Sequence, residues 1–153
     1  MGFSEKMRDS LGGEGAKIEV VPPSDAVAPG DTARFAVVIV GGSKAAAVDA
    51  LTLRLVQAVR HWVDASGNTH DEDSVDGEAR LAMTAGWTRT TCAEWQMPLT
   101  VTVEPGMRHT IEVELAVPPD AVATSAACTH ALSVQADIKG QIDPTGQARV
   151  QLA

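Results

Sequence analysis

The sequence predicts an all-β protein in which two antiparallel sheets pack face to face as a β-sandwich. Apolar and polar residues alternate in seven or eight segments, turn residues separate these segments roughly every 8 to 15 residues, and only one segment has a helical pattern. The chain has 153 residues, which is the length of one ordinary domain and too short for a second full core.

The helical pattern lies at the N-terminus, where Phe3, Met7 and Leu11 fall four residues apart before a Gly-Gly pair. We therefore expect residues 1–15 to form a short amphipathic helix and a Gly-rich linker, and residues 16–153 to form the sandwich domain. Strands are expected at AKIEVV, TARFAVVIV and ALTLRLVQAVRHWV, with Pro- and Gly-rich loops between them. The third is unusually long, and a bulge is expected near residues 56–58, where its alternation blurs.

The later segments continue this pattern with two exceptions. DASGN is expected to form a hairpin tip, and EARLAMT is expected to form a strand with Ala79, Leu81 and Met83 inward, whereas residues 85–97 fit no clear pattern. LTVTVEPGMRHTIEVELAV predicts two strands joined by a Pro-Gly turn. After a crossover at DAVATSAA, CTHALSVQADI and QARVQL are expected to form the last two strands.

Charge and composition limit the class of partner. The net charge is −8, and a block of six acidic residues interrupted by no Lys or Arg accounts for most of it, so no basic face for nucleic acid or anionic membrane is expected. No apolar run is long enough for membrane insertion, and MGFSEKMRDSLGG lacks the apolar stretch of a secretory signal, so a cytoplasmic location is expected. The six acidic residues are Asp64, Asp71, Glu72, Asp73, Asp76 and Glu78.

The acidic block from Asp64 to Glu78 has two interpretations. Its oxygen ligands have several calcium-like spacings, but an EF-hand loop would need Gly in place of Thr69 and Glu in place of Val75. A solvated hairpin tip, with like charges that discourage edge-to-edge aggregation, is favoured over a weak calcium site.

The histidines, cysteines and tryptophans are expected to be structural. His109 and His130 fall on inward faces, where a hydrogen-bonded core histidine is favoured over a ligand or a general base, and no two histidines have a metal-binding spacing. Cys92 and Cys128 are isolated and are expected to be small buried hydrophobes. The other two histidines are His61 and His70. The tryptophans are Trp62, Trp87 and Trp95, and for these three core or edge packing is favoured over a sugar-stacking platform.

No catalytic motif selects a set of residues. The chain has no GxSxG elbow, no Gly-rich phosphate loop and no HExxH, so no catalytic residue, cofactor or metal ligand is predicted. Asp137 and Asp143 flank the bend between the last two strands and could form an acid pair. However, Asp137 falls on a polar face and Asp143-Pro144 has the composition of a turn.

A set of short motifs resembles the N-terminal half of the sporulation-control (stage-zero sporulation M) family. The motifs are, in order, LGGEGAKIEV, VAPGDT, VIVGG, LTLRLV, ELAVPPD and ADIKGQIDPTG. The resemblance implies an arrestin-type sandwich of the N-domain kind, no catalysis, and a cytoplasmic regulatory or scaffolding role through protein contacts. In the family a second sandwich usually follows this last motif, and Gly146-Gln147-Ala148 replaces a more acidic continuation.

Three functions remain as hypotheses from the sequence. The leading one is a non-enzymatic bacterial interaction module whose edge strands and loops contact other proteins, with a homodimer through an edge strand as one possibility. The alternative is a calcium- or carbohydrate-binding sandwich that uses the acidic block or the tryptophans. The third is a hydrolase with an unrecognised His, Asp and Ser cluster.

Overall fold

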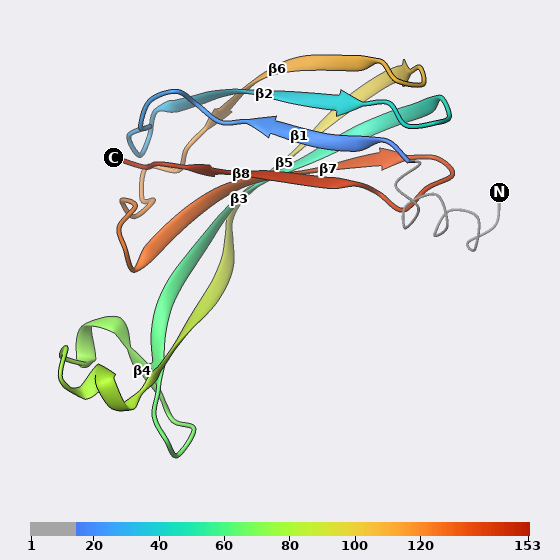
Figure 1. Cartoon of the computed structure of the whole chain (residues 1–153). Coiled ribbons are helices and arrows are strands. Elements are labelled where there is room, and N and C mark those ends of the chain that lie inside the picture. Colours follow the sequence, from blue (N-terminus) through green and yellow to red (C-terminus); the bar gives the residue numbers. More distant parts are fainter. Residues whose placement is uncertain (1–14) are drawn as a thin grey trace.

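A computed structural model describes residues 15–153, and these form two antiparallel sheets packed face to face (Figure 1). The predicted sandwich is therefore confirmed, while the expected N-terminal helix lies outside the described residues. The strands are β1 (Lys17–Val21), β2 (Thr32–Val40), β3 (Ala46–Val63), β4 (Thr69–Asp71), β5 (Thr84–Val103), β6 (Arg108–Ala116), β7 (Cys128–Ile138) and β8 (Thr145–Val150), and two 3-10 helices are η1 (Glu72–Ser74) and η2 (Ala79–Ala82).

The smaller sheet has the strand order β1-β2-β6. In the larger sheet β3 pairs with β5 along one side, and with β7 and then β4 along the other, while β8 pairs with the far side of β7. The inward faces alternate with exposed residues as the sequence predicts, because successive side chains of a strand point to opposite faces. The best buried side chains of the core are Val37, Ile39, Leu51, Leu53, Leu55, Val134, Ile138 and Leu152.

The predicted irregularity of the long strand is also confirmed. β3 has 18 residues, and its register against β5 shifts between Leu55 and Val56, where Cys92 is the extra residue on β5. A second shift occurs between Val48 and Ala50. The strand therefore runs through the sandwich and continues past its end.

One predicted strand is wrong. Residues 79–82 form η2 instead of a strand, and the Leu81 side chain, expected inward, is 88% exposed. The Asp76 side chain accepts a hydrogen bond from the Ala79 backbone N–H at 2.8 Å, which starts a helical turn. Alternation over so few residues also fits a helix built from the good helix formers Ala, Arg and Leu. Hydrogen bonds to a neighbouring strand would have been needed to make this segment a strand.

The Pro-Gly turn joins two sheets and does not form a hairpin. Gly106 has a positive φ of 72°, and the Met107 N–H donates to the Glu104 carbonyl at 3.0 Å, as expected for a tight turn. However, β5 pairs with β3 and β6 pairs with β2, so the strands on either side of this turn belong to different layers. Local turn chemistry predicted the bend, and pairing with distant strands decided its topology.

The two sides of the sandwich differ. On one side β1 approaches β8 so closely that a Cβ on Gly146 would lie 2.4 Å from the Ile18 carbonyl oxygen, which explains why glycine is needed there. On the other side, the outer edges of β5 and β6 have no partner strand within residues 15–153. In the described part of the chain, no helix has the length and apolar character of a membrane span.

Candidate functional site

The part of the molecule that stands apart from the sandwich is an arm formed by residues 60–87 (Figure 1). β7 pairs with β3 only as far as Val59, so beyond this residue β3 pairs with β5 and with the short β4. From Thr84 to Thr91 every residue of β5 except Gly86 is exposed. Because a two-stranded ribbon buries little apolar surface, other contacts must hold the arm together.

An ion cluster around Glu72 supplies these contacts. Arg60 donates to both carboxylate oxygens, from Nε at 2.9 Å and from Nη2 at 2.5 Å, and Arg80 Nη2 lies 2.9 Å from Oε1. Trp62 Nε1 donates to Oε2 at 2.8 Å, and the Arg60 and Arg80 guanidinium groups lie 5.2 and 5.0 Å from the centroid of its ring. The Arg60 hydrogen bond is the largest cause that lowers the pKa of Glu72 to about 2. The ionised carboxylate therefore ties η1 and η2 to β3.

A second carboxylate, Asp64, organises the hairpin tip. Its Oδ1 accepts the backbone N–H groups of Ser66 and Asn68 at 2.9 and 3.0 Å, and its Oδ2 lies 2.8 Å from His70 Nε2. The His70 hydrogen bond is the first cause that lowers the pKa of Asp64. The DASGN segment thus forms the predicted tip, closed by side-chain to backbone bonds.

The structure divides the acidic block into two groups. Asp71, Asp73, Asp76 and Glu78 are exposed, as a solvated tip predicts. The prediction is wrong for Glu72, whose side chain is only 16% exposed because it binds two arginines. Those arginines are the nearest basic residues before and after the block in the sequence, a signal that the sequence reasoning missed. No group of three or more His, Cys, Asp or Glu side chains suited to a metal ion occurs within residues 15–153.

The four histidines are not gathered at one site. His61 and His70 lie in the arm on opposite faces of the ribbon, since His70 pairs with Trp62, the neighbour of His61. His109 is half-buried on β6 in the other sheet. His130 is 2% exposed, and its Nδ1 lies 2.7 Å from the Thr124 hydroxyl, so the predicted hydrogen-bonded core histidine is confirmed at this position. Burial lowers the pKa of His130.

The three tryptophans do not form one shared platform. Two guanidinium groups lie over the Trp62 ring, and Trp95 is half-buried against the core. The predicted core packing is therefore confirmed for Trp95, whereas Trp62 packs against two guanidinium groups in the arm. Trp87, on the arm part of β5, is 45% exposed.

The two thiols are free, and they differ in environment. Cys128 is buried at the start of β7, as predicted. Cys92 is half-buried at the bulge of β5, and its Sγ lies 3.3 Å from Gln57 Oε1. Desolvation raises the pKa of both thiols, which disfavours a reactive thiolate.

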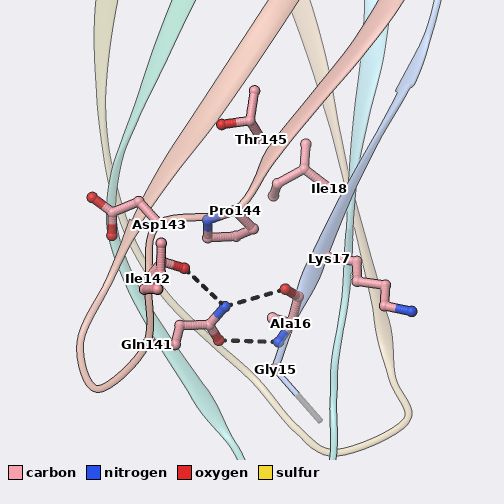
Figure 2. Close-up of a pocket in the computed structure, with 9 residues that line it drawn as sticks. All are labelled: Gly15, Ala16, Lys17, Ile18, Gln141, Ile142, Asp143, Pro144 and Thr145. Atoms are coloured by element: carbon pink, nitrogen blue, oxygen red, sulfur yellow. Dashed lines mark hydrogen bonds between the residues drawn. The ribbon is translucent and has the colours of Figure 1, made fainter. Parts of the chain in front are cut away.

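A shallow hollow of about 350 Å³ lies where β1 begins beside the β7–β8 turn (Figure 2). Gln141, 7% exposed, fills its inner wall: Oε1 accepts the Ala16 N–H at 3.0 Å, and Nε2 donates to the Ala16 carbonyl at 3.2 Å and to the Ile142 carbonyl at 3.4 Å. The Gln141 side chain thus makes the hydrogen bonds to Ala16 that the backbone of a neighbouring strand would otherwise make. Its polar atoms are thus committed to joining the first strand to the last hairpin, and they are not presented to a ligand.

The two aspartates at this end do not form an acid pair. Asp137 is exposed on the outer face of β7, as predicted. Asp143 Oδ1 accepts the Ile138 backbone N–H at 3.2 Å, so it performs the turn chemistry expected from Asp143-Pro144.

One known structure supports the fold. The crystal structure of Spo0M, a sporulation control protein from Bacillus subtilis, matches with a TM-score of 0.68 and 21% identity over 90% of this chain and 49% of that chain. This chain therefore spans about half the length of that protein. Weaker matches are the CARDB domain of the PF1109 protein from Pyrococcus furiosus (TM-score 0.47, 10% identity, 90% of this chain and 87% of that chain) and a DUF4466 family protein from Parabacteroides merdae (TM-score 0.49, 10% identity, 90% and 45%).

The sequence comparisons give the family. No curated protein matches the chain. The family model described as SpoOM protein matches residues 4–153, which is nearly the whole chain. This chain is therefore a member of the Spo0M sporulation-control family.

Proposed function

We propose that this chain is a non-enzymatic regulatory or scaffold protein of the sporulation-control type, which acts in the cytoplasm by binding other proteins along the outer edge of β5. The observation that carries the proposal is the length and exposure of this edge. β5 has 20 residues, and its far side carries no partner strand within residues 15–153. Its arm half, which consists of the arm residues 84–87 and the next four residues, is exposed except at Gly86.

An unpaired strand edge presents a row of backbone N–H and C=O groups to solvent. An extended segment of another protein can add to such a row as a further strand, so that backbone hydrogen bonds supply affinity. The bulge at Cys92 and Pro98 restrict ladder growth along the sandwich half of β5. The arm half, from Thr84 to Thr91, contains neither feature and is the better docking edge.

Other features are consistent with this proposal. The free thiols Cys92 and Cys128 are compatible with a reducing compartment. The two acidic residues of the block that are half-buried, Asp64 and Glu72, are engaged by His70, Arg60 and Arg80, so no observation favours the calcium alternative. The tryptophans likewise do not favour the carbohydrate alternative, because two of the three are covered by other groups.

Site-specific photo-cross-linking tests the proposal. A photoreactive amino acid is placed at Thr88 or Thr90 on the arm half of β5, and at the exposed Lys17 of β1 as a control on the closed side of the sandwich. Irradiation in a lysate is expected to give discrete cross-linked protein bands from the β5 positions and not from Lys17. The same bands at all three positions, or none at Thr88 and Thr90, would refute binding along this edge.

A further inference from the structure

The outer face of the five-stranded sheet contains a groove lined by two arginines that have no carboxylate partner. Of the seven arginines within residues 15–153, five lie within 4.0 Å of a glutamate oxygen. The other two, Arg89 and Arg149, are both exposed, and no ion pair or hydrogen bond of their side chains occurs in the described part of the chain. Both line the same two adjoining hollows, of about 220 and 660 Å³.

Strand register explains how the two arginines come together. Arg89 on β5 pairs with Ala58 on β3, which in turn pairs with Thr129 on β7, while Arg149 on β8 pairs with Ala131 on β7. All five residues point away from the core, because their neighbours along β7 and β8, such as His130 and Val150, are the buried ones. The two arginines therefore flank a floor of small side chains, which leaves the space between them open.

One end of the groove offers further binding groups. Trp87, 45% exposed, lines the larger hollow together with Ser125 and Gln151. An exposed indole ring gives apolar contact area, and the hydroxyl and amide groups give hydrogen-bond donors and acceptors.

The charge of the groove contrasts with that of the molecule. The chain has a net charge of −8, yet no Asp or Glu lines either hollow. On the same outer face, the Glu94 carboxylate is already engaged by Arg54 at 2.7 Å. A neighbouring hollow contains Asp25 as well as Arg149, but these two side chains do not form an ion pair. The groove is thus a local positive site on an acidic protein.

We propose that this groove binds an acidic peptide segment of a partner protein, with one carboxylate on Arg89 and a second on Arg149. This inference rests on the proposed function as an interaction module and specifies the chemistry of its partner. The planar guanidinium group binds a carboxylate through two parallel hydrogen bonds. A pair of arginines is too small a basic surface to favour nucleic acid.

The spacing of the two arginines sets the spacing of the acids. The Arg89 and Arg149 backbones are separated by three strand intervals, about 14 Å, and by the two-residue step along β7 from Thr129 to Ala131, about 7 Å, which gives about 16 Å in all. An extended peptide advances about 3.3 Å per residue and places residues i and i+4 on the same face about 13 Å apart. The long arginine side chains cover the remaining difference, so acidic residues four positions apart are expected to fit the groove.

Peptide binding to the full chain tests the inference, with fluorescence anisotropy at low ionic strength as the readout. The probes are degenerate extended peptide pools with Glu at i and i+4, with Glu at i and i+1, with Gln at i and i+4, or with phosphoserine at i and i+4. Arg89→Gln and Arg149→Gln test the groove. Arg34→Gln is the matched control, because Arg34 is an exposed arginine on the other sheet.

The Glu i and i+4 pool is expected to bind, and each groove substitution is expected to weaken its binding about tenfold, which corresponds to one lost charge-assisted contact. Arg34→Gln is expected to change it less than twofold, and the Gln pool is expected not to bind. The inference is overturned by equal weakening in Arg34→Gln, by no binding of any Glu pool, or by binding of the phosphoserine pool alone. Self-association of the chain that Arg89→Gln abolishes would likewise overturn it, because the occupant would then be a second copy.

The two proposals can fail separately. If cross-links form at Thr88 and Thr90 while the Glu pools do not bind, only the groove assignment is lost. If the Glu pools bind through Arg89 and Arg149 while the β5 edge gives no cross-link, peptide binding by this chain stands and docking along the edge is refuted.

Discussion

Replacement of Gln141 by alanine is expected to destabilise the sandwich by about 2–6 kcal/mol. The side chain accepts the Ala16 N–H at 3.0 Å and donates to the Ala16 carbonyl at 3.2 Å (Figure 2). Ala16 is 4% exposed, so the substitution leaves one donor and one acceptor buried without partners. Each such group costs about 1–3 kcal/mol, so the two together give about 2–6 kcal/mol, and for a chain of this length this corresponds to a fall in Tm of roughly 4–24 °C.

Urea unfolding followed by circular dichroism measures this change as a lower midpoint at constant slope. Gln151→Ala removes an exposed glutamine and is the matched control, expected to stay within about 0.5 kcal/mol of the parent. Gln141→Glu keeps the acceptor for the Ala16 N–H and loses the donor, so an intermediate loss is expected. If Gln141→Ala behaves like Gln151→Ala, the side chain does not join β1 to the last hairpin as argued.

Three further predictions concern other parts of the molecule. Gly146→Ala is expected to cost about 1–3 kcal/mol in urea unfolding, because its Cβ would meet a backbone carbonyl of β1 at 2.4 Å. Glu72→Gln is expected to increase protease cleavage in the arm with little change in global unfolding. Because the folded pKa of Glu72 is lowered from 4.5 to about 2, its contribution is present above pH 4.5 and lost as the pH falls toward 2, which proteolysis by an acid protease measures. Burial lowers the pKa of His130, so stability is expected to fall as the pH drops below its ordinary value of 6.5, and His130→Gln should reduce that dependence.

Each of these predictions has a control. Gly77→Ala adds a Cβ with no atom within 4 Å and is expected to leave stability within about 0.5 kcal/mol. Glu78→Gln changes an exposed carboxylate of the same acidic block and should leave arm cleavage unchanged. An unchanged pH profile in His130→Gln would show that other groups cause the acid loss of stability.

Much of the fold follows from the two-residue alternation of the strands and from the turn residues between them. Inward residues such as Val37, Leu53 and Val134 were predictable because a strand buried on one face must alternate. The hairpin tip at Asp64 and the turn at Asp143 were predictable because Asp bonds nearby backbone groups. The family resemblance also came from short motifs, and the match over residues 4–153 confirms it.

The candidate sites depend on contacts between residues far apart in the sequence, and side-chain periodicity does not reveal such contacts. Glu72 meets Arg60 and Arg80 only because β4, η1 and η2 fold back on β3. The segment around Leu81 became a helix because it has no partner strand. Register across β5, β3, β7 and β8 decided that Arg89 and Arg149 line one groove, although 60 positions in the sequence separate them.

The sequence by itself determined the fold class and most of the inward faces, because these depend on local side-chain period and on turn chemistry, and its short motifs resembled the family that the family model then matched. The tertiary structure alone decided that β3 and β5 extend beyond the sandwich as an arm, that the Pro-Gly turn joins two layers, and which arginines lack a carboxylate. The physical reason is that strand partners and ion pairs are chosen by contacts between residues far apart in the chain, and the two-residue period is the same whichever partner a strand takes.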